Sequence, residues 1–510
     1  MAGADELVLS LLVLAPFLGG LSIIFIPGRQ ANAIRSVATA VTGFTFALSI
    51  YLTLRHYLAA PADAEFWPLT RVEWLPSLGI GFTLGVDGIS VLMVLLNGVV
   101  AFAGTLIAWR IPDRSKEFFV LFLLLIAGVY GVFVALDLFF FFFFYELAVI
   151  PMYLLIGVWG SSTDFRSYLP PLPFSRSREY SAMKLTIMLS LGSVLVWVAL
   201  IALYVNAANP TFDFLSLRDN EEYSRTFQLI FFPLVAVGFG VLAGLWPFHT
   251  WSPDGHVAAP SAVSMVHAGV LMKLGAYGIL RVGMTVLPEG AQDWMPVLVV
   301  LGAVNVIYGA ISAMGQRDLK YVIGYSSVSH MGYVLMGLAT LHHLGVSGAV
   351  MQMFSHGVMT ALFFAVVGAI YDRTHTRDIG VLEGMAKRMG TTAWLFAIAG
   401  LASLGLPGLS GFVAELLVFL GLFQTYPILG ALGVVGAAIT AVYILRLIGK
   451  VFFGELGEQW RDQVDISRRE AGASVILAGF ILLMGLFPFP FLSAIDGNVA
   501  ELITRVTGAG

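Results

Sequence analysis

The chain has 510 residues, of which 58% are hydrophobic and 11% are charged, and its formal net charge is −4. Because ordinary soluble domains carry about 25% charged residues, this composition excludes a soluble enzyme and indicates a polytopic helical membrane protein. The sequence has no cysteine and no basic tail or patch, which excludes disulfides, iron–sulfur clusters, thiolate metal sites and nucleic-acid binding for this chain.

Long apolar runs follow one another along the chain and are continuous rather than alternating, which favours helices over a β-barrel. The first run follows Asp5 and Glu6 and has no cleavage signature, so we expect it to remain as a span. Runs bounded by charges, proline or glycine predict about fourteen spans. Their approximate ranges are 7–27, 33–58, 86–110, 118–137, 138–159, 183–206, 226–248, 263–287, 293–314, 319–340, 345–371, 391–424, 427–453 and 470–491.

The distribution of basic residues predicts the orientation. Of the 27 lysines and arginines, twenty lie in or beside the odd-numbered loops, and six lie in or beside the even-numbered loops and the C-terminus. Cytoplasmic loops carry the excess of basic residues, so the odd loops should face the cytoplasm. Both termini are then expected on the opposite side of the membrane.

Two predicted spans are interrupted in their interiors. The seventh runs apolar from Phe227 to Trp246 and breaks at residues 247–256, and the twelfth breaks at residues 405–411, just before Glu415. Unwound backbone is tolerated inside a membrane only where it lines a cavity, and breaks in corresponding spans of two halves indicate a transporter with inverted repeats. Spans four to eight and nine to thirteen would form the halves. A simple proline kink in each span is the alternative.

Three formal charges lie deep inside apolar runs, namely Glu146, Lys273 and Glu415. A charge near the bilayer centre costs roughly 2.5–3.5 kcal/mol, so membrane proteins place one there mainly for ion pathways, proton relays or counter-ions. His330 and His356 extend this series through the tenth and eleventh spans. Carboxylates, an ammonium and imidazoles in series favour a proton relay, with helix-to-helix hydrogen bonding as the structural alternative.

Several motifs, taken together, resemble the antiporter-like M subunits (chain 4) of proton-pumping NADH:quinone oxidoreductase, respiratory complex I. The resemblance covers nearly the whole chain. The motifs are residues 85–90 (GVDGIS), 143–153 (FFYELAVIPMY), 246–254 (WPFHTWSPD), 267–278 (HAGVLMKLGAYG), 325–332 (YSSVSHMG) and 406–408 (LPG) with Glu415.

The resemblance implies an all-α fold of about fourteen transmembrane helices, with two inverted five-helix repeats and discontinuous seventh and twelfth helices. It divides a single transmembrane domain into four parts. These parts are the N-terminal helices (1–116), a first repeat (117–290), a second repeat (291–455) and a C-terminal helix (456–510).

The same resemblance assigns roles to the buried residues. Glu146 matches the fifth-helix glutamate and Lys273 the eighth-helix lysine that connects the two halves. His330 and His356 match histidines of the central polar axis, and Glu415 matches the twelfth-helix carboxylate. A carboxylate at that last position separates subunit M from its sister subunits, which usually carry lysine there.

One residue of the family pattern is missing. The family places a lysine on the seventh helix, paired with the fifth-helix glutamate, where this chain has Leu242. An unpaired buried carboxylate is costly, so another group should replace the lysine, with His249, His267 or Lys184 as candidates. The alternative is that the first half-channel is altered or idle.

The resemblance implies that this chain moves protons from the cytoplasm outward while quinone is reduced elsewhere in the complex. It implies no cofactor or metal on this chain, with NADH, FMN, iron–sulfur clusters and quinone on other subunits. The expected partners are the other membrane-arm and peripheral subunits, including the sister antiporter-like subunits, and the lipid of a bacterial inner membrane. Two alternatives stay open: a subunit of a multisubunit Na⁺/H⁺ antiporter, and a membrane scaffold whose polar residues only specify packing.

Overall fold

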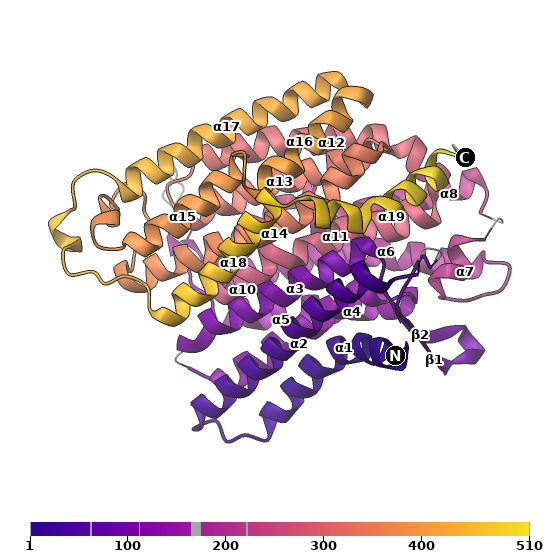
Figure 1. The fold of residues 1–510 in the computed structure, drawn as a ribbon, viewed down its shortest axis with the longest axis horizontal. Helices are drawn as coiled ribbons and strands as arrows, with labels where there is room; N and C mark the ends of the chain where they lie inside the picture. Colours follow the sequence, from indigo (N-terminus) through magenta and orange to yellow (C-terminus); the bar gives the residue numbers. More distant parts are fainter. Residues whose placement is uncertain (1, 62–63, 112, 165–174, 221–222, 509–510) are drawn as a thin grey trace.

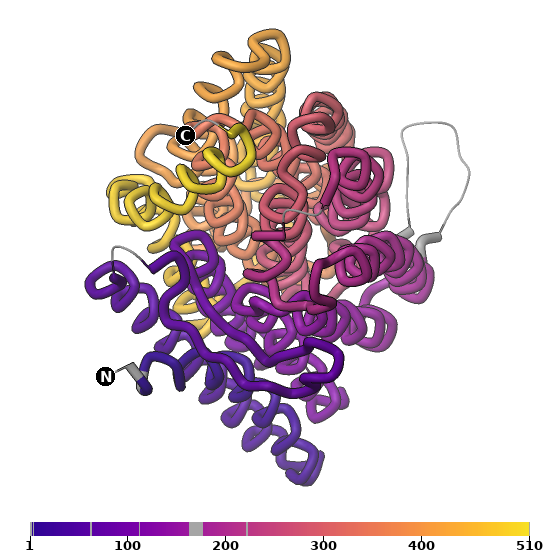
Figure 2. Tube along the Cα trace, turned by 90° about the vertical axis from the view of Figure 1, so that its right-hand side faces the viewer, coloured from indigo at the N-terminus to yellow at the C-terminus, as the bar shows by residue number. Residues whose placement is uncertain are grey.

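A computed structural model describes residues 2–61, 64–111, 113–164, 175–220 and 223–508. Figure 1 shows its helices lying side by side in one bundle, with both chain ends at the same end of the bundle. Figure 2 shows the N-terminal helices on one side of the bundle and the helix over residues 427–452 on the opposite side, while the two C-terminal helices pack against the helix over residues 88–107. The architecture is therefore mostly helical, as the composition predicts.

The helices before the first break are α1 (Ala2–Ile24), α2 (Ala31–Ala59), α3 (Gly88–Ile107), α4 (Ser115–Val134), α5 (Leu138–Trp159), α6 (Arg178–Val205), α7 (Phe214–Arg218) and α8 (Arg225–Ala243). The later helices are α9 (Trp251–Ala258), α10 (Ser261–Val266), α11 (Met272–Gly278), α12 (Pro288–Met314), α13 (Leu319–Ala339), α14 (His343–Thr374), α15 (Gly390–Ser403), α16 (Ser410–Thr425), α17 (Pro427–Phe452), α18 (Arg468–Leu486) and α19 (Phe489–Thr507). Short 3₁₀ turns are η1 (Pro76–Leu78), η2 (Ala108–Arg110), η3 (Phe248–Thr250), η6 (Met385–Lys387) and η7 (Glu458–Trp460).

Among the described residues, twelve helical segments are long and apolar enough to cross a membrane. Two of them are fully buried inside the bundle over their most apolar stretch: α14 and the segment 261–284. A span buried on every side contacts protein rather than lipid, so polar side chains on these two segments can be shielded from hydrocarbon.

Polar residues at the helix starts explain where several spans begin. Asp137 accepts hydrogen bonds from the backbone N–H groups of Phe139 and Phe140 at the start of α5. Asp318 does the same at the start of α13. Each side chain satisfies amide groups that have no partner within the first turn of a helix.

The structure confirms the predicted break in the seventh span. Helix α8 ends at Gly244, whose φ of +78° is in the left-handed region, and the helix resumes in η3 and α9. The side chain of Asn305 on α12 accepts from Trp246 N at 2.6 Å and donates to Gly244 O at 2.8 Å. A side chain from a neighbouring span therefore satisfies the backbone that the break frees.

The break in the twelfth span is also confirmed. Helix α15 ends at Ser403 and α16 begins at Ser410. Gly405 (φ +71°) and Gly408 (φ +91°) lie between them in the left-handed region, where a side chain would be strained. The break places backbone of the loop against the carboxylate of Glu415, because a Cβ on Gly405 would lie 2.8 Å from Glu415 Oε2.

The eighth span departs from the prediction of a regular helix. Two π-helical segments, η4 (His267–Leu271) and η5 (Ile279–Met284), flank α11. A π turn has the same side-chain composition as an α-helix, so an apolar sequence pattern does not reveal it. Such turns occur frequently at functional sites.

Two small sheets and one amphipathic helix lie outside the predicted spans. Strands β1 (Leu69–Leu75) and β2 (Ile80–Gly85) form an antiparallel hairpin, and β3 (Thr163–Asp164) pairs with β4 (Ser175–Arg176). Helix α19 buries Phe491, Ile495, Val499, Leu502 and Val506 along one face. Helix α19 packs against α3, α12 and α14 and runs across the bundle in Figure 1.

Candidate functional site: a buried polar chain

Four of the predicted residues form one connected line through the core. Lys273 Nζ lies 2.7 Å from His356 Nδ1, and the rings of His356 and His330 have their centroids 5.4 Å apart. His330 Nδ1 lies 3.4 Å from Glu415 Oε1. All four residues are at most 4% exposed. The line joins α11, α14, α13 and α16, so a sequence separation of 142 residues is bridged by three contacts.

The π turn helps to hold the ammonium of Lys273. Its Nζ donates to the backbone carbonyl of Ala268, five residues earlier, at 2.5 Å. A π segment shifts hydrogen bonding from four residues to five, which leaves a carbonyl of η4 for this side chain. Lys273 therefore has one backbone acceptor and one imidazole, and no carboxylate is needed to place it.

Polar neighbours also orient the ring of His330. Its Nε2 lies 3.0 Å from the hydroxyl of Ser403, the last residue of α15. Its Nδ1 lies 3.2 Å from Gln352 Nε2 as well as near Glu415. One nitrogen thus faces both an amide and a carboxyl group: it accepts from the amide when it is unprotonated, and it donates to Glu415 when it carries a proton.

Two further buried histidines lie beside Lys273. The rings of His256 on α9 and His267 on η4 have centroids 4.1 Å apart, and both side chains are fully buried. The hydroxyl of Ser252 lies 3.1 Å from His256 Nε2. His256 Nε2 also lies 3.4 Å from the sulfur of Met272, the residue before Lys273, which places the pair beside Lys273. His267 is one of the candidates predicted from the sequence, whereas His256 is not.

Ring nitrogens around Lys273 lack protein partners. Within the described part of the chain, neither nitrogen of His267 makes a hydrogen bond, and the same holds for His256 Nδ1 and His356 Nε2. Buried polar atoms in proteins are almost always hydrogen-bonded, to protein or to ordered water. The geometry therefore calls for water beside these rings, as a proton relay requires.

Glu146 is placed differently from Glu415. It lies on α5 and is half-buried, and its Oε1 has no hydrogen-bond partner among the described residues. The hydroxyl of Ser193 on α6 is its polar neighbour. Leu242, at the position where the family pattern has lysine, is fully buried on α8. No cation of the described residues forms an ion pair with Glu146 at 4.0 Å or less.

The three candidate replacements lie in three different settings. Lys184 Nζ pairs with Asp254 at 2.8 Å, and Tyr321 donates to the same carboxylate at 3.1 Å. His249 is buried, with its ring edge against Tyr308 of α12 at 4.9 Å between centroids. His267 belongs to the histidine pair beside Lys273. The ammonium of Lys184 is thus already paired.

A recess that sequence reasoning does not anticipate lies at the end of the bundle opposite the chain termini. It has a volume of about 390 Å³, and its lining includes Arg110, Lys320, Asp372 and His375. Lys320 is 3% exposed and donates to Ala259 O at 2.7 Å, and its charge reaches His256. In the sequence, Lys320 lies at the start of a predicted span, where a basic residue is usually exposed in the adjoining loop. Its burial depends on the backbone carbonyl of Ala259, which lies 61 residues earlier in the sequence.

No described group of three His, Cys, Asp or Glu side chains is arranged to hold a metal ion. The buried chain is built instead from an ammonium, imidazoles, carboxylates and hydroxyls. These are the groups that exchange protons through hydrogen bonds and water, so the arrangement is suited to proton transfer.

Comparison with known proteins places this arrangement in a family. Residues 135–440 match the family described as NADH:quinone oxidoreductase/Mrp antiporter, TM. The chain is 36% identical to NAD(P)H-quinone oxidoreductase chain 4 2 of Thermosynechococcus vestitus, over 98% of this chain and 92% of that protein. It is 37% identical to a chain 4 protein of Synechococcus elongatus, over 97% and 91% of the two chains.

Solved structures show the same fold. A chain of respiratory complex I from Thermus thermophilus, with bound NADH, superposes with a TM-score of 0.87 at 27% identity, covering 98% of this chain and 99% of that chain. A chain of the Mrp complex from Dietzia sp. has the same fold, with a TM-score of 0.85 at 21% identity, covering 99% and 98%. The chain therefore belongs to the NADH:quinone oxidoreductase/Mrp antiporter family of membrane subunits.

Proposed function

We propose that this chain is a proton-translocating membrane-arm subunit of an NAD(P)H:quinone oxidoreductase. The connected line from Lys273 through His356 and His330 to Glu415 carries this proposal. Each contact in the line is a direct hydrogen bond or a gap that one water can bridge. The line offers successive protonatable groups shielded from lipid, which is the arrangement found in proton relays of pumps and transporters.

In this proposal electrons stay on other subunits. NADH, FMN, the iron–sulfur clusters and quinone belong to those partners, and quinone reduction supplies the free energy. A change of charge at one end of the polar line shifts the proton affinity of the next group, because charges interact strongly where water is scarce. Lys273, between the two halves, is the switch that passes this shift on.

Fourteen spans fit this role. The twelve apolar helices are joined by α13, which is polar on several faces, and by the broken span made of α15 and α16. The first repeat (117–290) and the second (291–455) each contain one broken helix. The positions of the two breaks support an inverted repeat.

The excess of basic residues in the odd loops supports termini on the non-cytoplasmic side of a bacterial inner membrane.

For the first repeat, the pair His256 and His267 is the best replacement for the missing lysine. The ammonium of Lys184 is paired with Asp254, and the ring of His249 lies against Tyr308 on α12. The histidine pair has three ring nitrogens free of protein partners within the described residues and lies next to Lys273. Protons would enter through the recess at Lys320, which lies on the cytoplasmic side in the proposed orientation.

A subunit of a Na⁺/H⁺ antiporter would have the same fold. A scaffold subunit would require every buried polar group to have a hydrogen-bond partner within the protein. Relatives at 36–37% identity over nearly the full length carry the chain 4 name, which favours the oxidoreductase. Four unpartnered ring nitrogens around Lys273 do not suit a purely structural role.

The test is the number of protons moved per quinone reduced in membrane vesicles that contain the whole complex. Lys273→Ala should assemble and still reduce quinone while losing coupled pumping. Lys450→Ala, which changes an exposed lysine at the end of α17, is the control and should pump as the wild type does. Native pumping by Lys273→Ala would refute the proposed function.

A further inference from the structure

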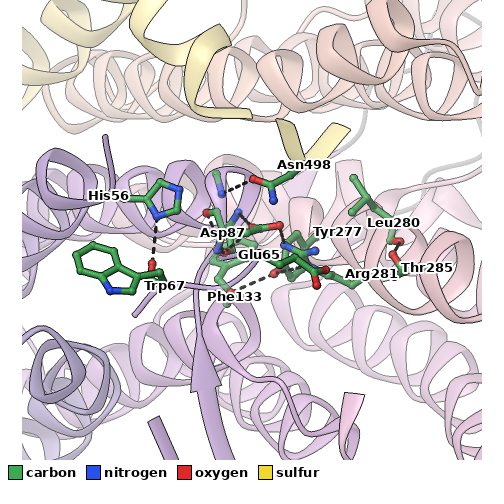
Figure 3. Close-up of polar contacts among 12 residues, drawn as sticks. His56, Glu65, Trp67, Asp87, Phe133, Tyr277, Leu280, Arg281, Thr285 and Asn498 are labelled. Carbon is green, nitrogen blue, oxygen red and sulfur yellow. Dashed lines mark hydrogen bonds and ion pairs between the residues drawn. The ribbon is translucent and has the colours of Figure 1, made fainter. Parts of the chain in front are cut away.

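Two further polar side chains, Tyr277 and Arg281, follow Lys273 on its own span. Lys273, Tyr277 and Arg281 are spaced four residues apart, so they lie above one another along one side of the span. Arg281 Nε donates to Tyr277 Oη at 3.1 Å, and Tyr277 Oη donates to the carbonyl of Phe133 at 3.1 Å. Figure 3 shows Tyr277, Arg281 and Phe133 close together, with dashed lines marking their polar contacts.

This series of side chains ends at a buried ion pair. Arg281, on the π segment η5, pairs with Asp87, which caps α3. Asp87 accepts from Ser90 N at 2.8 Å and from Ser90 Oγ at 2.9 Å. Asp87 is 1% exposed and Arg281 is 8% exposed. Removing one partner would leave a buried charge uncompensated, so the pair is not an incidental surface contact.

Helix α19 covers this pair. Asn498 accepts from Gly88 N at 2.9 Å. A Cβ at Gly88 would lie 1.6 Å from the carbonyl oxygen of Ala494, so only glycine allows α19 to approach so closely. A recess of about 20 Å³ remains between them, lined by Glu65, Asp87, Arg281, Thr285, Asn498 and Glu501 among others. A cavity above roughly 10–15 Å³ holds one water when polar partners surround it.

Carboxylates lie on the outer side of this recess. Glu65 pairs with Arg218, while Glu501 on α19 is exposed overall and lines the recess. Burial of its carboxyl and the nearby charges of Glu65 and Asp87 raise the pKa of Glu501, against the opposing effect of Arg218 and Arg505. Glu501 therefore takes up a proton more readily than a carboxylate in open water.

We propose that the Asp87–Arg281 pair is the outer gate of the proton route from Lys273, and that Glu501 receives the released proton. This inference rests on the proposed function. Eight residues of helix advance by about 12 Å from Lys273 to Arg281, and the route of the proton is longer than this because Lys273 Nζ lies toward Ala268, on the side away from Arg281. While the pair is closed, the Arg281 guanidinium repels a proton from either side and prevents back-flow.

When the pair separates, Asp87 becomes a free acceptor. An N–H bond of the Lys273 ammonium breaks, and its proton passes through water to form an O–H bond on Asp87. That O–H bond then breaks as the proton moves through the recess to Glu501 and on to bulk water. Lys273 is left neutral and is recharged from the polar chain, and both carboxylates return to their ionised form. Arg281 stays charged throughout and acts as a positioning residue.

The gate is tested in vesicles that hold the complete complex. Arg281→Gln should lose coupled pumping as fully as Lys273→Ala, and a preformed pH gradient should decay faster through it than through the wild type. Arg281→Lys keeps the charge and should restore much of both properties. Arg225→Gln breaks an exposed ion pair with Asp293 and is the matched control, with native behaviour expected.

Glu501→Gln keeps the inference testable if the Arg281 variants fail to assemble. Its position is exposed, so the complex should form, and pumping should fall and lose part of its dependence on outside pH. Native pumping and a native pH profile in Glu501→Gln would overturn the gate, as would native pumping in Arg281→Gln. If those variants and Lys273→Ala all pump normally, the proposed function itself fails.

Discussion

In the proposed second repeat (residues 291–455) the carboxylate of Glu415 contacts His330, and the line continues to Lys273 without a gap wider than one water. In the first repeat the corresponding carboxylate, Glu146, has one oxygen without a hydrogen-bond partner among the described residues, and Leu242 stands where the family pattern has a cation. The two proposed repeats therefore each contain a broken helix but differ in the polar groups that surround the carboxylate. This difference indicates that the fold tolerates the loss of the cation at position 242. Other protonatable groups, here the buried histidines, must then lie nearby.

The largest effect should come from breaking the well-connected repeat. Glu415→Gln removes the proton-accepting carboxylate beside His330 and keeps its size. We expect proton transfer to slow by about tenfold or more, which corresponds to ~1.4 kcal/mol or more in the barrier. Proton-to-quinone ratios in vesicles measure this, with Glu458→Gln on an exposed 3₁₀ turn as the control. A native ratio in Glu415→Gln would break the comparison.

A substitution in the first repeat can restore the family pattern. Leu242→Lys should be tolerated because Glu146 can pair with the new ammonium. In a Glu146→Gln background the same lysine would be unpaired and should cost roughly 2.5–3.5 kcal/mol, lowering assembly. Thermal stability of the purified complex, compared across the four members of the cycle, measures the coupling. Equal costs in both backgrounds would show that position 242 does not face Glu146.

The same cycle reports on function. Glu146→Gln should lower the pumping ratio less than Glu415→Gln does, because the histidine pair supplies other protonatable groups in the first repeat. In a chain that keeps Glu146, His267→Ala should lower the pumping ratio more than Glu146→Gln does. Adding Leu242→Lys to His267→Ala should restore part of that loss. A native ratio in Glu146→Gln would mean that the first half-channel is idle.

The smallest effect concerns the start of the helix that carries Glu146. Burial raises the pKa of Asp137 to about 6, even though the N–H groups of Gly81, Phe140 and Phe139 donate to it. A carboxyl whose pKa is higher in the folded state stabilises the fold at pH below its unfolded value near 4, and this contribution is lost as the pH rises through about 6.

Asp137→Asn removes that titration and keeps an acceptor for the helix cap. As the pH rises from about 4 to about 6, the wild type should lose stability relative to the variant, by on the order of 2 kcal/mol or less. Thermal unfolding of the complex between about pH 5 and pH 7.5 checks the sign. A difference in stability that stays constant over this range, or that moves in favour of the wild type as the pH rises, would contradict it. Pumping should stay native, which separates helix stability from relay function.

Local patterns were enough to predict the twelve long apolar helices of the described residues, both breaks and the four residues that form the polar line. Lys273 and Glu415 stand out because charge is rare in apolar runs, and Gly405 and Gly408 mark the break by their backbone freedom. The burial of Lys320 and the pairing of Asp87 with Arg281 could not be predicted, since each depends on a contact between segments far apart in sequence. His256 belongs to a motif that was recognised as a break, so its side chain was overlooked.

The β-hairpin and the π segments were missed for other reasons. Residues 69–85 lie between two apolar runs, and a short hairpin of this kind adds little to a hydropathy pattern. The π segments differ from an α-helix only in hydrogen-bond register, which depends on how α10 and α11 pack against α3, α8 and α14.

The central claim is that protons move through water between buried ionisable groups. A high-resolution structure of the whole complex tests it most directly, by locating ordered water around His267, His256 Nδ1 and His356 Nε2. We predict water molecules that bridge these nitrogens and continue from the recess at Lys320 to Lys273. A dry interior, with the same side chains held in fixed contacts that satisfy every ring nitrogen, would contradict the account.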